Sequence, residues 1–265
     1  MSYRTGLSHV MTSVIEPCAE QAGSRGRFPR ASVRALGRAG LLGLTVSAEA
    51  GGGGRGPAEA AEVVREISRV CPATGAVLRS HYAAVAVIDA YGSPWLRRRI
   101  AAGEHLSTLA LTEAGESATA APAPGTRSTA TRTGEVVALS ARKRDVVGAA
   151  EADSYLWSSR PVDGRDGMTL WLVPADAAGL FVPARPDGAG PRGSATSTVC
   201  ADPVLVPAGA MLGPNGGGLD LVLGSVLPWL AATPVASGPD RAPEATVRDR
   251  GGTAVPAAGE KLPAS

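Results

Sequence analysis

The 265-residue sequence has few aromatic residues and no marked excess of charge of either sign. Aromatic side chains make up only 4% of the chain, so a hydrophobic core must be built mostly from Leu, Val and Ala. The 26 Lys and Arg residues nearly balance the 24 Asp and Glu residues. This balance argues against nucleic acid or an anionic membrane surface as a partner.

Cysteines and long apolar runs are also scarce. Cys18, Cys71 and Cys200 lie far apart and form no Cys-x-x-Cys pair, so neither a zinc site nor a disulfide framework is expected. No stretch approaches the roughly 20 apolar residues of a membrane-spanning helix, and the N-terminus has no signal-peptide pattern. We therefore expect no metal site, no membrane partner and a cytoplasmic location.

Apolar residues recur at helical spacing between about residues 30 and 92. Val33 and Leu36 lead to a glycine stop at residues 40–43, a second segment covers residues 63–70, and a third runs from Val77 to Tyr91. Three amphipathic helices joined by glycine-containing loops must cover one another's apolar faces. We therefore group residues 1–105 as an N-terminal helical domain.

Short, often β-branched runs replace the helical pattern after His105. Each is bounded by Gly, Pro or Asp, and they cover residues 106–112, 135–139, 154–158, 169–173, 180–182, 197–200 and 204–206. A Pro/Ala/Thr/Ser stretch at residues 118–132 is predicted to be a surface loop. The spacing predicts a mostly antiparallel β-sandwich or barrel as a middle domain over residues 106–213.

The last organised element follows the glycine cluster at residues 216–218. Apolar residues between 219 and 227 predict a helix within residues 214–234, and Pro228 and Pro234 should kink or stop it. Residues 235–265 consist largely of Pro, Gly, Ala and charged residues. That composition cannot bury enough apolar surface to offset the entropy of ordering, so a disordered tail is predicted.

Several segments, in this order along the chain, resemble the acyl-CoA dehydrogenase family. They include the glycine turns of residues 36–44, the run 97–104, the strand 110–113 and the run 204–207. The resemblance implies an α+β multidomain fold in which a helical domain is followed by the β-sandwich or barrel. Only the first helix of the family's C-terminal helical domain is matched, so a truncated, degenerate member is expected.

Members of that family remove the α-proton of an acyl thioester with a glutamate while a hydride passes to FAD. The resemblance therefore implies an FAD-dependent oxidoreductase whose substrate is an acyl-CoA or acyl-carrier thioester. Where some members carry that glutamate, residues 228–230 of this chain read Pro-Trp-Leu. No catalytic residue can be assigned, and weak or absent catalysis is expected.

The resemblance also places a flavin pocket on two strands and the turn after the first of them. The cofactor-binding positions it implies are Leu109, Leu111, Thr112, Ser117, Ala118, Asp145 and Val147. Asp145 and Val147 stand where the family has an aromatic residue and a Thr or Ser, and Glu116 would oppose the charge of the pyrophosphate. Weak or absent FAD binding is therefore predicted.

Three other features have ordinary structural interpretations beside functional ones. His81 and His105 are interpreted as structural histidines. The basic run at residues 142–144 either meets a phosphate group of FAD or CoA or forms a solvated face.

Two alternatives to an acyl-CoA dehydrogenase-like enzyme stay open. The chain could be a non-catalytic module that binds an acyl thioester or a partner subunit. It could also be the product of a reading frame truncated or frame-shifted near residue 231, where family-like sequence stops. The resemblance also implies that the helical face on which the missing domain would pack is uncovered and would need a second copy or a partner subunit to cover it.

Overall fold

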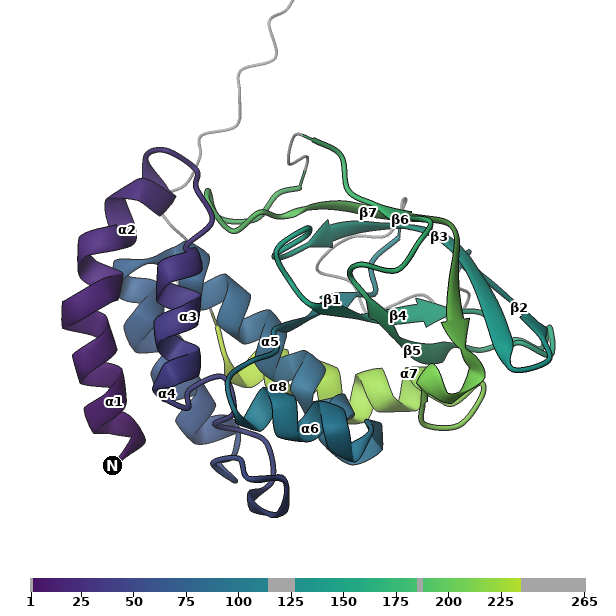
Figure 1. Ribbon diagram of the computed structural model, residues 1–265, viewed down its shortest axis with the longest axis horizontal. Helices are drawn as coiled ribbons and strands as arrows, with labels where there is room; N and C mark the ends of the chain where they lie inside the picture. Colours follow the sequence, from purple (N-terminus) through teal and green to yellow (C-terminus); the bar gives the residue numbers. More distant parts are fainter. Residues whose placement is uncertain (1, 114–126, 185–187, 235–265) are drawn as a thin grey trace, which may run out of the picture.

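In the computed structural model, helices form one side of the molecule and two β-sheets form the other (Figure 1). The structure describes residues 2–113, 127–184 and 188–234. Two hydrophobic clusters join the halves of the described structure: the larger contains buried residues of the helices and of both sheets, and the smaller connects two of these helices and the C-terminal helix to one sheet. The order of helices and then mostly antiparallel strands confirms the predicted fold class.

The helical half contains six α-helices within the described residues. They are α1 Tyr3–Val10, α2 Glu16–Gly23, α3 Arg30–Arg38, α4 Pro57–Val70, α5 Pro72–Tyr91 and α6 Pro94–Ala101, with a π-helical turn Met11–Ile15 joining α1 to α2. Three of them, α3 to α5, confirm the helices predicted from apolar spacing. Two prolines at first-turn positions start α4 and α5, where no backbone donor is lost.

Helix α5 is the central element, because nearly all of its length is buried. It packs against α4 on one side and against strand β1 on another. The helix ends at Tyr91, before Gly92, as the sequence predicts. A helix buried all round is suited to carry residues into an internal site.

Two glycines allow the end of α3 to meet the end of α6. A Cβ atom on Gly37 would lie 2.4 Å from the carbonyl oxygen of Gly103, and Gly103 itself has a φ of +74°. Side chains at these positions would force the two backbones apart. Gly37 and Gly103, which lie outside the glycine stop at residues 40–43, are therefore a point of close backbone packing.

The β-half is a sandwich of two four-stranded sheets. The first has the order β1 Ser107–Ala110, β4 Ser154–Ser159, β5 Thr169–Pro174 and β8 Met211–Leu212. The second has the order β2 Thr129–Thr133, β3 Val136–Val146, β7 Ser197–Pro207 and β6 Leu180–Phe181. All pairings are antiparallel except β1 with β4, which confirms a mostly antiparallel sandwich.

Several strand predictions are wrong in extent. The predicted surface loop at residues 118–132 includes β2, which forms a hairpin with β3 around Gly134 and Glu135; residues 118–126 lie outside the described residues. Strand β3 continues to Val146 instead of ending at Leu139, and β7 is one strand over both predicted runs. Strand β2 was missed because its Thr and Arg side chains are mostly exposed and leave no apolar alternation.

The C-terminal helix does not stop at Pro228. It runs as α7 Gly218–Leu221, a π-helical turn Val222–Val226, and α8 Leu227–Ala232, packed along α5. Pro228 lies in the first turn of α8, directly after the π-helical turn. Such a turn lets a helix continue past a proline, which has no backbone N–H to donate a hydrogen bond to the preceding turn. The helix ends before Pro234, as predicted.

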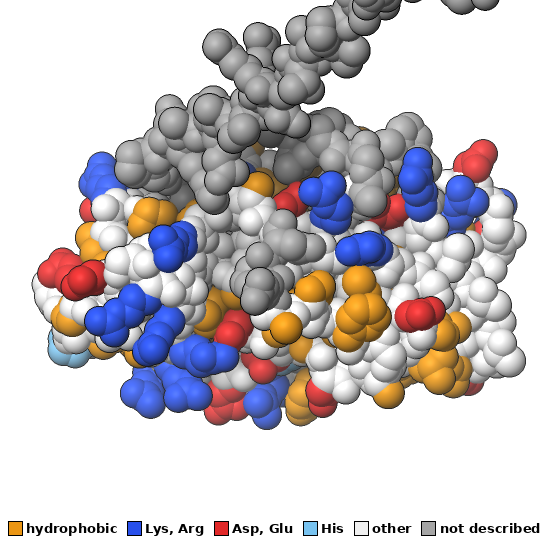
Figure 2. Space-filling view, turned by 90° about the horizontal axis from the view of Figure 1, so that it is seen from above, with side chains coloured by type: hydrophobic (Ala, Val, Ile, Leu, Met, Phe, Trp, Pro, Cys, Tyr) orange, Lys and Arg blue, Asp and Glu red, His pale blue; other side chains and the backbone are white. Residues whose placement is uncertain are grey.

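The predicted domain boundaries at residues 105, 213 and 234 stay predictions, and the predicted tail at 235–265 lies outside the described residues. On the face seen in Figure 2, Lys and Arg side chains are interspersed with Asp, Glu and apolar side chains. In the described part of the chain, no helix combines the length and apolarity needed to cross a bilayer. The three cysteines are free.

Candidate functional site

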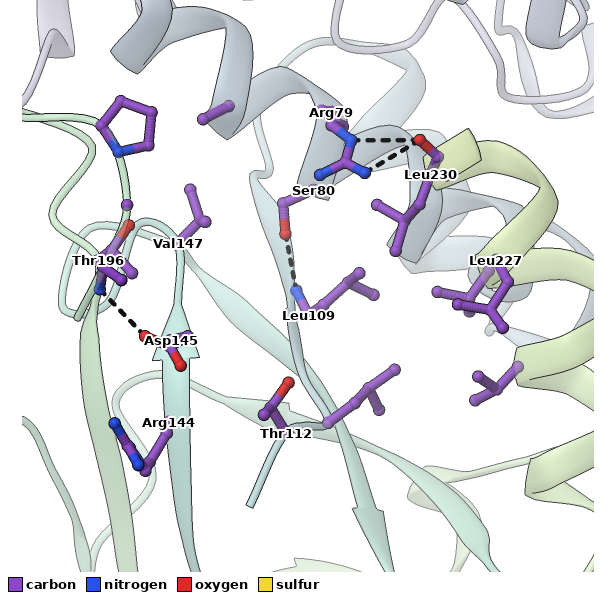
Figure 3. A pocket seen from close by; sticks show the side chains of 17 residues that line it. Arg79, Ser80, Leu109, Thr112, Arg144, Asp145, Val147, Thr196, Leu227 and Leu230 are labelled. Carbon is purple, nitrogen blue, oxygen red and sulfur yellow. Dashed lines mark hydrogen bonds between the residues drawn. The ribbon is translucent and has the colours of Figure 1, made fainter. Parts of the chain in front are cut away.

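A cavity of about 350 Å³ lies where α5, β1, β3 and the C-terminal helix meet (Figure 3). Its volume is at the lower end of the range for small-molecule sites, about 300–1,000 Å³. Apolar side chains from three elements form most of its walls.

Five of the seven predicted cofactor positions line this cavity. Leu109 comes from β1, Leu111 and Thr112 follow it directly, and Asp145 and Val147 come from the end of β3. The other two predicted positions, Ser117 and Ala118, lie outside the described residues. The structure thus brings two segments more than thirty residues apart in the sequence to one wall, although binding of a flavin there stays a prediction.

The sequence did not identify the residues that close the cavity from the helical side. Arg79 and Ser80 line it from α5, and Val226, Leu227 and Leu230 line it from the C-terminal helix. The helical spacing of the last three residues could have indicated an inward face. Nothing in the local sequence marks Ser80 as a cavity residue.

Ser80 joins α5 to the strand that carries the predicted flavin contacts. Its Oγ accepts a hydrogen bond from the Leu109 amide at 3.1 Å and lies 2.7 Å from Thr108 Oγ1. Thr108 Oγ1 in turn donates to the carbonyl oxygen of Val147 at 2.7 Å, so the Ser80 hydroxyl is the donor to Thr108. The Leu109 amide is therefore already bonded.

Thr112 presents the hydroxyl that is free for a ligand. Its side chain lies at the cavity between the two strands in Figure 3, and it forms no side-chain hydrogen bond with any residue that the structure describes. Its carbonyl oxygen accepts from the Arg144 amide at 2.9 Å, which ties β1 to β3 at this point. The backbone that carries the hydroxyl is thus fixed to β3.

Arg79 is a half-buried cation in the lining of the cavity. Its guanidinium donates two hydrogen bonds to the carbonyl oxygen of Leu230, at 3.0 and 3.3 Å (Figure 3). Burial lowers the pKa of Arg79 from its usual value. Leu230 lies in the last turn of α8, where a cation also compensates the negative end of the helix dipole.

The basic run at residues 142–144 does not form one surface. Lys143 is completely buried, so both predicted alternatives are wrong for it. Its Nζ lies 2.6 Å from Glu113 Oε1, 2.8 Å from Ser158 Oγ and 5.5 Å from the centre of the Trp157 ring. Its neighbours Arg142 and Arg144 are exposed, because alternate residues of a strand face opposite sides.

His81 is a structural residue, as predicted. It is fully buried, and the Ser107 amide donates to its Nδ1 at 3.1 Å. Its Nε2 therefore carries the proton and donates to the carbonyl oxygen of Leu42 at 3.0 Å. The ring joins α5 to β1 and to the loop after α3, and burial lowers its pKa to about 4.

The buried neutral state of His81 should make stability depend on pH. Since its folded pKa is near 4 and its ordinary value is 6.5, the unfolded chain takes up the proton first as pH falls. The contribution of neutral His81 to the free energy of unfolding is thus fully present above pH 6.5. It falls by about 3 kcal/mol between pH 6.5 and 4. Urea unfolding of the wild type and of His81→Gln at several pH values should show a flatter profile for the variant. If the free energy of unfolding depended on pH equally in the variant and the wild type, this assignment would be contradicted. His9→Gln, on the exposed side of α1, is the control.

A group of serine, histidine and aspartate side chains beside β1 does not form a hydrolase site. His105 Nε2 lies 2.8 Å from Ser154 Oγ, which lies 2.9 Å from Ser107 Oγ. Burial lowers the pKa of His105, and the nearby Asp153 accepts the Leu106 amide. Ser154 is only 1% exposed, so a substrate cannot reach it. His105 is thus structural, as predicted.

Comparison with known proteins gives one family. Residues 2–103 match the family described as "Acyl-CoA dehydrogenase, N-terminal domain". A probable acyl-CoA dehydrogenase of Bacillus subtilis is 28% identical over 211 residues, which cover 75% of this chain and 54% of the relative. The human mitochondrial short-chain specific acyl-CoA dehydrogenase is 28% identical over 215 residues, which cover 78% of this chain and 51% of the relative.

A solved structure extends the similarity into the β-half. The crystal structure of a probable acyl-CoA dehydrogenase from Mycobacterium abscessus superposes with a TM-score of 0.73 and 26% sequence identity. The match covers 84% of this chain and 60% of that structure. The chain spans about half the length of the curated relatives it matches.

Proposed function

Because the chain belongs to the acyl-CoA dehydrogenase family, we propose that the cavity beside α5 holds the isoalloxazine ring of FAD and that the substrate is an acyl thioester. The observation that supports this most is that Leu111, Thr112 and Val147, taken from two separate strands, line one cavity. A bound flavin would supply the hydride acceptor. An acyl-CoA or acyl-carrier thioester is the substrate class proposed with it.

The described residues fit the ring of the cofactor in size and polarity. Leu111 and Val147 offer apolar walls, and Thr112 offers a hydroxyl without another partner in the described residues. Two features differ from an ideal flavin site, because the Leu109 amide is bonded to Ser80 and the carboxylate of Asp145 stands in the wall. We therefore propose weak FAD binding.

The described cavity offers little for general base catalysis. Asp145 is the one carboxylate among the residues that line it. Glu113, the nearest glutamate to Thr112 along the chain, is bonded to Lys143 and Ser128 in the interior of the sandwich. A second proposal, a module that binds an acyl thioester without oxidising it, is favoured by this lack of a free base.

The outer face of the C-terminal helix is the place where we propose contact with a second copy or a partner subunit. Leu223 is 47% exposed there, and Pro228 is exposed on the same helix. Exposed apolar side chains are candidates for contact with another protein. Sedimentation of the purified chain tests whether a stable oligomer forms.

Flavin binding is directly measurable. We expect titration of FAD into the purified chain to give a saturable change in the visible absorption of the flavin. Thr112→Val should weaken binding about fivefold to tenfold, because it removes one hydrogen bond of about 1 kcal/mol or slightly more. The control is Thr131→Val on the exposed strand β2. No saturable change, or equal affinities for the wild type and Thr112→Val, would contradict the proposal.

A further inference from the structure

We propose that the carboxylate of Asp145 makes the cavity disfavour negative charge on a bound ligand. A flavin bound there is therefore harder to reduce. The inference rests on the proposed flavin site and assigns to one residue a property of that site. It follows from the backbone at Asp145, from the bonding of its carboxylate, and from the charges around it.

A β-bulge turns Asp145 towards the cavity. Lys143 pairs with Val199 and Val146 pairs with Ser197, so residues 144 and 145 together oppose a single residue of β7. Asp145 has a φ of +54°, in the left-handed region. Aspartate and asparagine adopt this conformation more readily than most residues, so the bulge is compatible with a short polar side chain.

The carboxylate is held in a fixed position by the loop before β7. Its Oδ1 accepts a hydrogen bond from the Ala189 amide at 3.1 Å. The loop is itself fixed, because the Gly188 amide donates to the Thr196 carbonyl oxygen and Ser194 Oγ lies 2.6 Å from Thr196 Oγ1. The carboxylate thus cannot easily swing away from a ligand.

The negative charge of Asp145 is not compensated by an ion pair within the described residues. The two cations of the cavity lining are Arg144 and Arg79. Arg144 is exposed, and Arg79 is bonded to the carbonyl oxygen of Leu230 on the C-terminal helix. Asp145 is half-buried and the remaining cavity lining is largely apolar, so solvent and these two arginines are what screens its charge.

Reduction of a flavin in the cavity adds negative charge to the ring, and the carboxylate of Asp145 repels that charge. An oxidised isoalloxazine takes up two electrons and one proton at neutral pH, which leaves one negative charge on the ring. A nearby carboxylate of the same sign disfavours that charged state. Asp145 should therefore weaken binding of the reduced ring more than binding of the oxidised ring, and so lower the midpoint potential.

The test compares the wild type with Asp145→Asn. Asparagine tolerates the left-handed backbone and can still accept from the Ala189 amide, so only the charge changes. FAD is titrated into each protein, and the midpoint potential of bound FAD is then measured by spectroelectrochemistry with dithionite as reductant. The variant should bind reduced FAD about tenfold more tightly relative to oxidised FAD, which raises the potential by about 30 mV for a two-electron couple.

Two further variants separate the possible causes. Asp202→Asn removes an exposed carboxylate on β7 and should leave the potential unchanged. Asp145→Gly also tolerates the backbone but removes both charge and hydrogen bond, so a shift in Asp145→Gly without one in Asp145→Asn would overturn the electrostatic inference. Bound FAD with equal potentials in the wild type and Asp145→Asn would overturn it as well. Absence of flavin absorption in every variant would overturn the proposed function, and this inference with it.

Discussion

Replacing Lys143 by methionine is expected to destabilise the protein by about 3–5 kcal/mol, because it leaves a buried carboxylate without its cation. Lys143 is fully buried and Glu113 is 5% exposed. Glu113 also accepts the amides of Arg127 and Ser128, so it cannot move towards solvent without losing them. Urea unfolding monitored by circular dichroism measures the loss.

Two controls make this prediction specific. Arg132→Met breaks a surface pair with Glu135 and should cost less than about 1 kcal/mol, because exposed ion pairs contribute little. The double variant Glu113→Gln/Lys143→Met should regain part of the stability, since replacing both partners of a buried pair is much less costly than removing one. A loss for Lys143→Met no larger than that for Arg132→Met would contradict the assignment.

The ion pair also stabilises the strand end that faces the cavity. Ser158 Oγ, which accepts from Lys143, lies within hydrogen-bond distance of the carbonyl oxygen of Leu111 at 3.4 Å. Glu113 follows Thr112 directly. The positions of Leu111 and Thr112 therefore depend on a buried polar cluster on the other side of their strand.

The sequence predicted the elements whose determinants are local. Helix α4 combines a proline at its first turn with apolar residues repeating at helical spacing, and both signals act within fourteen residues. The strands of the first sheet have apolar, β-branched or aromatic runs ended by turn residues. The five cavity residues were placed together by family resemblance, because no local pattern joins Thr112 to Asp145.

The features that were missed depend on partners distant in sequence. Lys143 continues the alternation that places Val137 and Leu139 inside the sandwich. Its burial was not predicted, because its sequence neighbours are basic and its partner Glu113 is thirty residues away. The helix tolerates Pro228 because a π-helical turn precedes it. Helix signals in the local sequence do not predict such a turn. Ser80 reaches the cavity only because α5 packs on β1, so its role required the three-dimensional fold.

Dehydrogenation of acyl-CoA by residues 1–265 alone is expected to be about 10²- to 10⁴-fold slower than by a full-length relative assayed beside it. That range is the usual loss when a positioned general base is absent. In the described cavity the one candidate is Asp145, and its Oδ1 is already bonded to the Ala189 amide. The assay is dye-linked reduction with a panel of short, branched and aromatic acyl-CoAs and excess FAD.

Asp145→Asn decides between the two ways in which this prediction can fail. If the wild type turns over rapidly and the variant does not, Asp145 is the base, and its carboxylate must then approach the substrate despite the bond to Ala189. If both proteins turn over rapidly, a carboxylate outside the described cavity residues reaches the substrate. If neither protein turns over rapidly while both retain FAD, flavin binding and proton removal are separate requirements. Binding a flavin needs only a cavity of the right shape and hydrogen bonds, whereas proton removal needs a base within about 3 Å of the substrate carbon's proton.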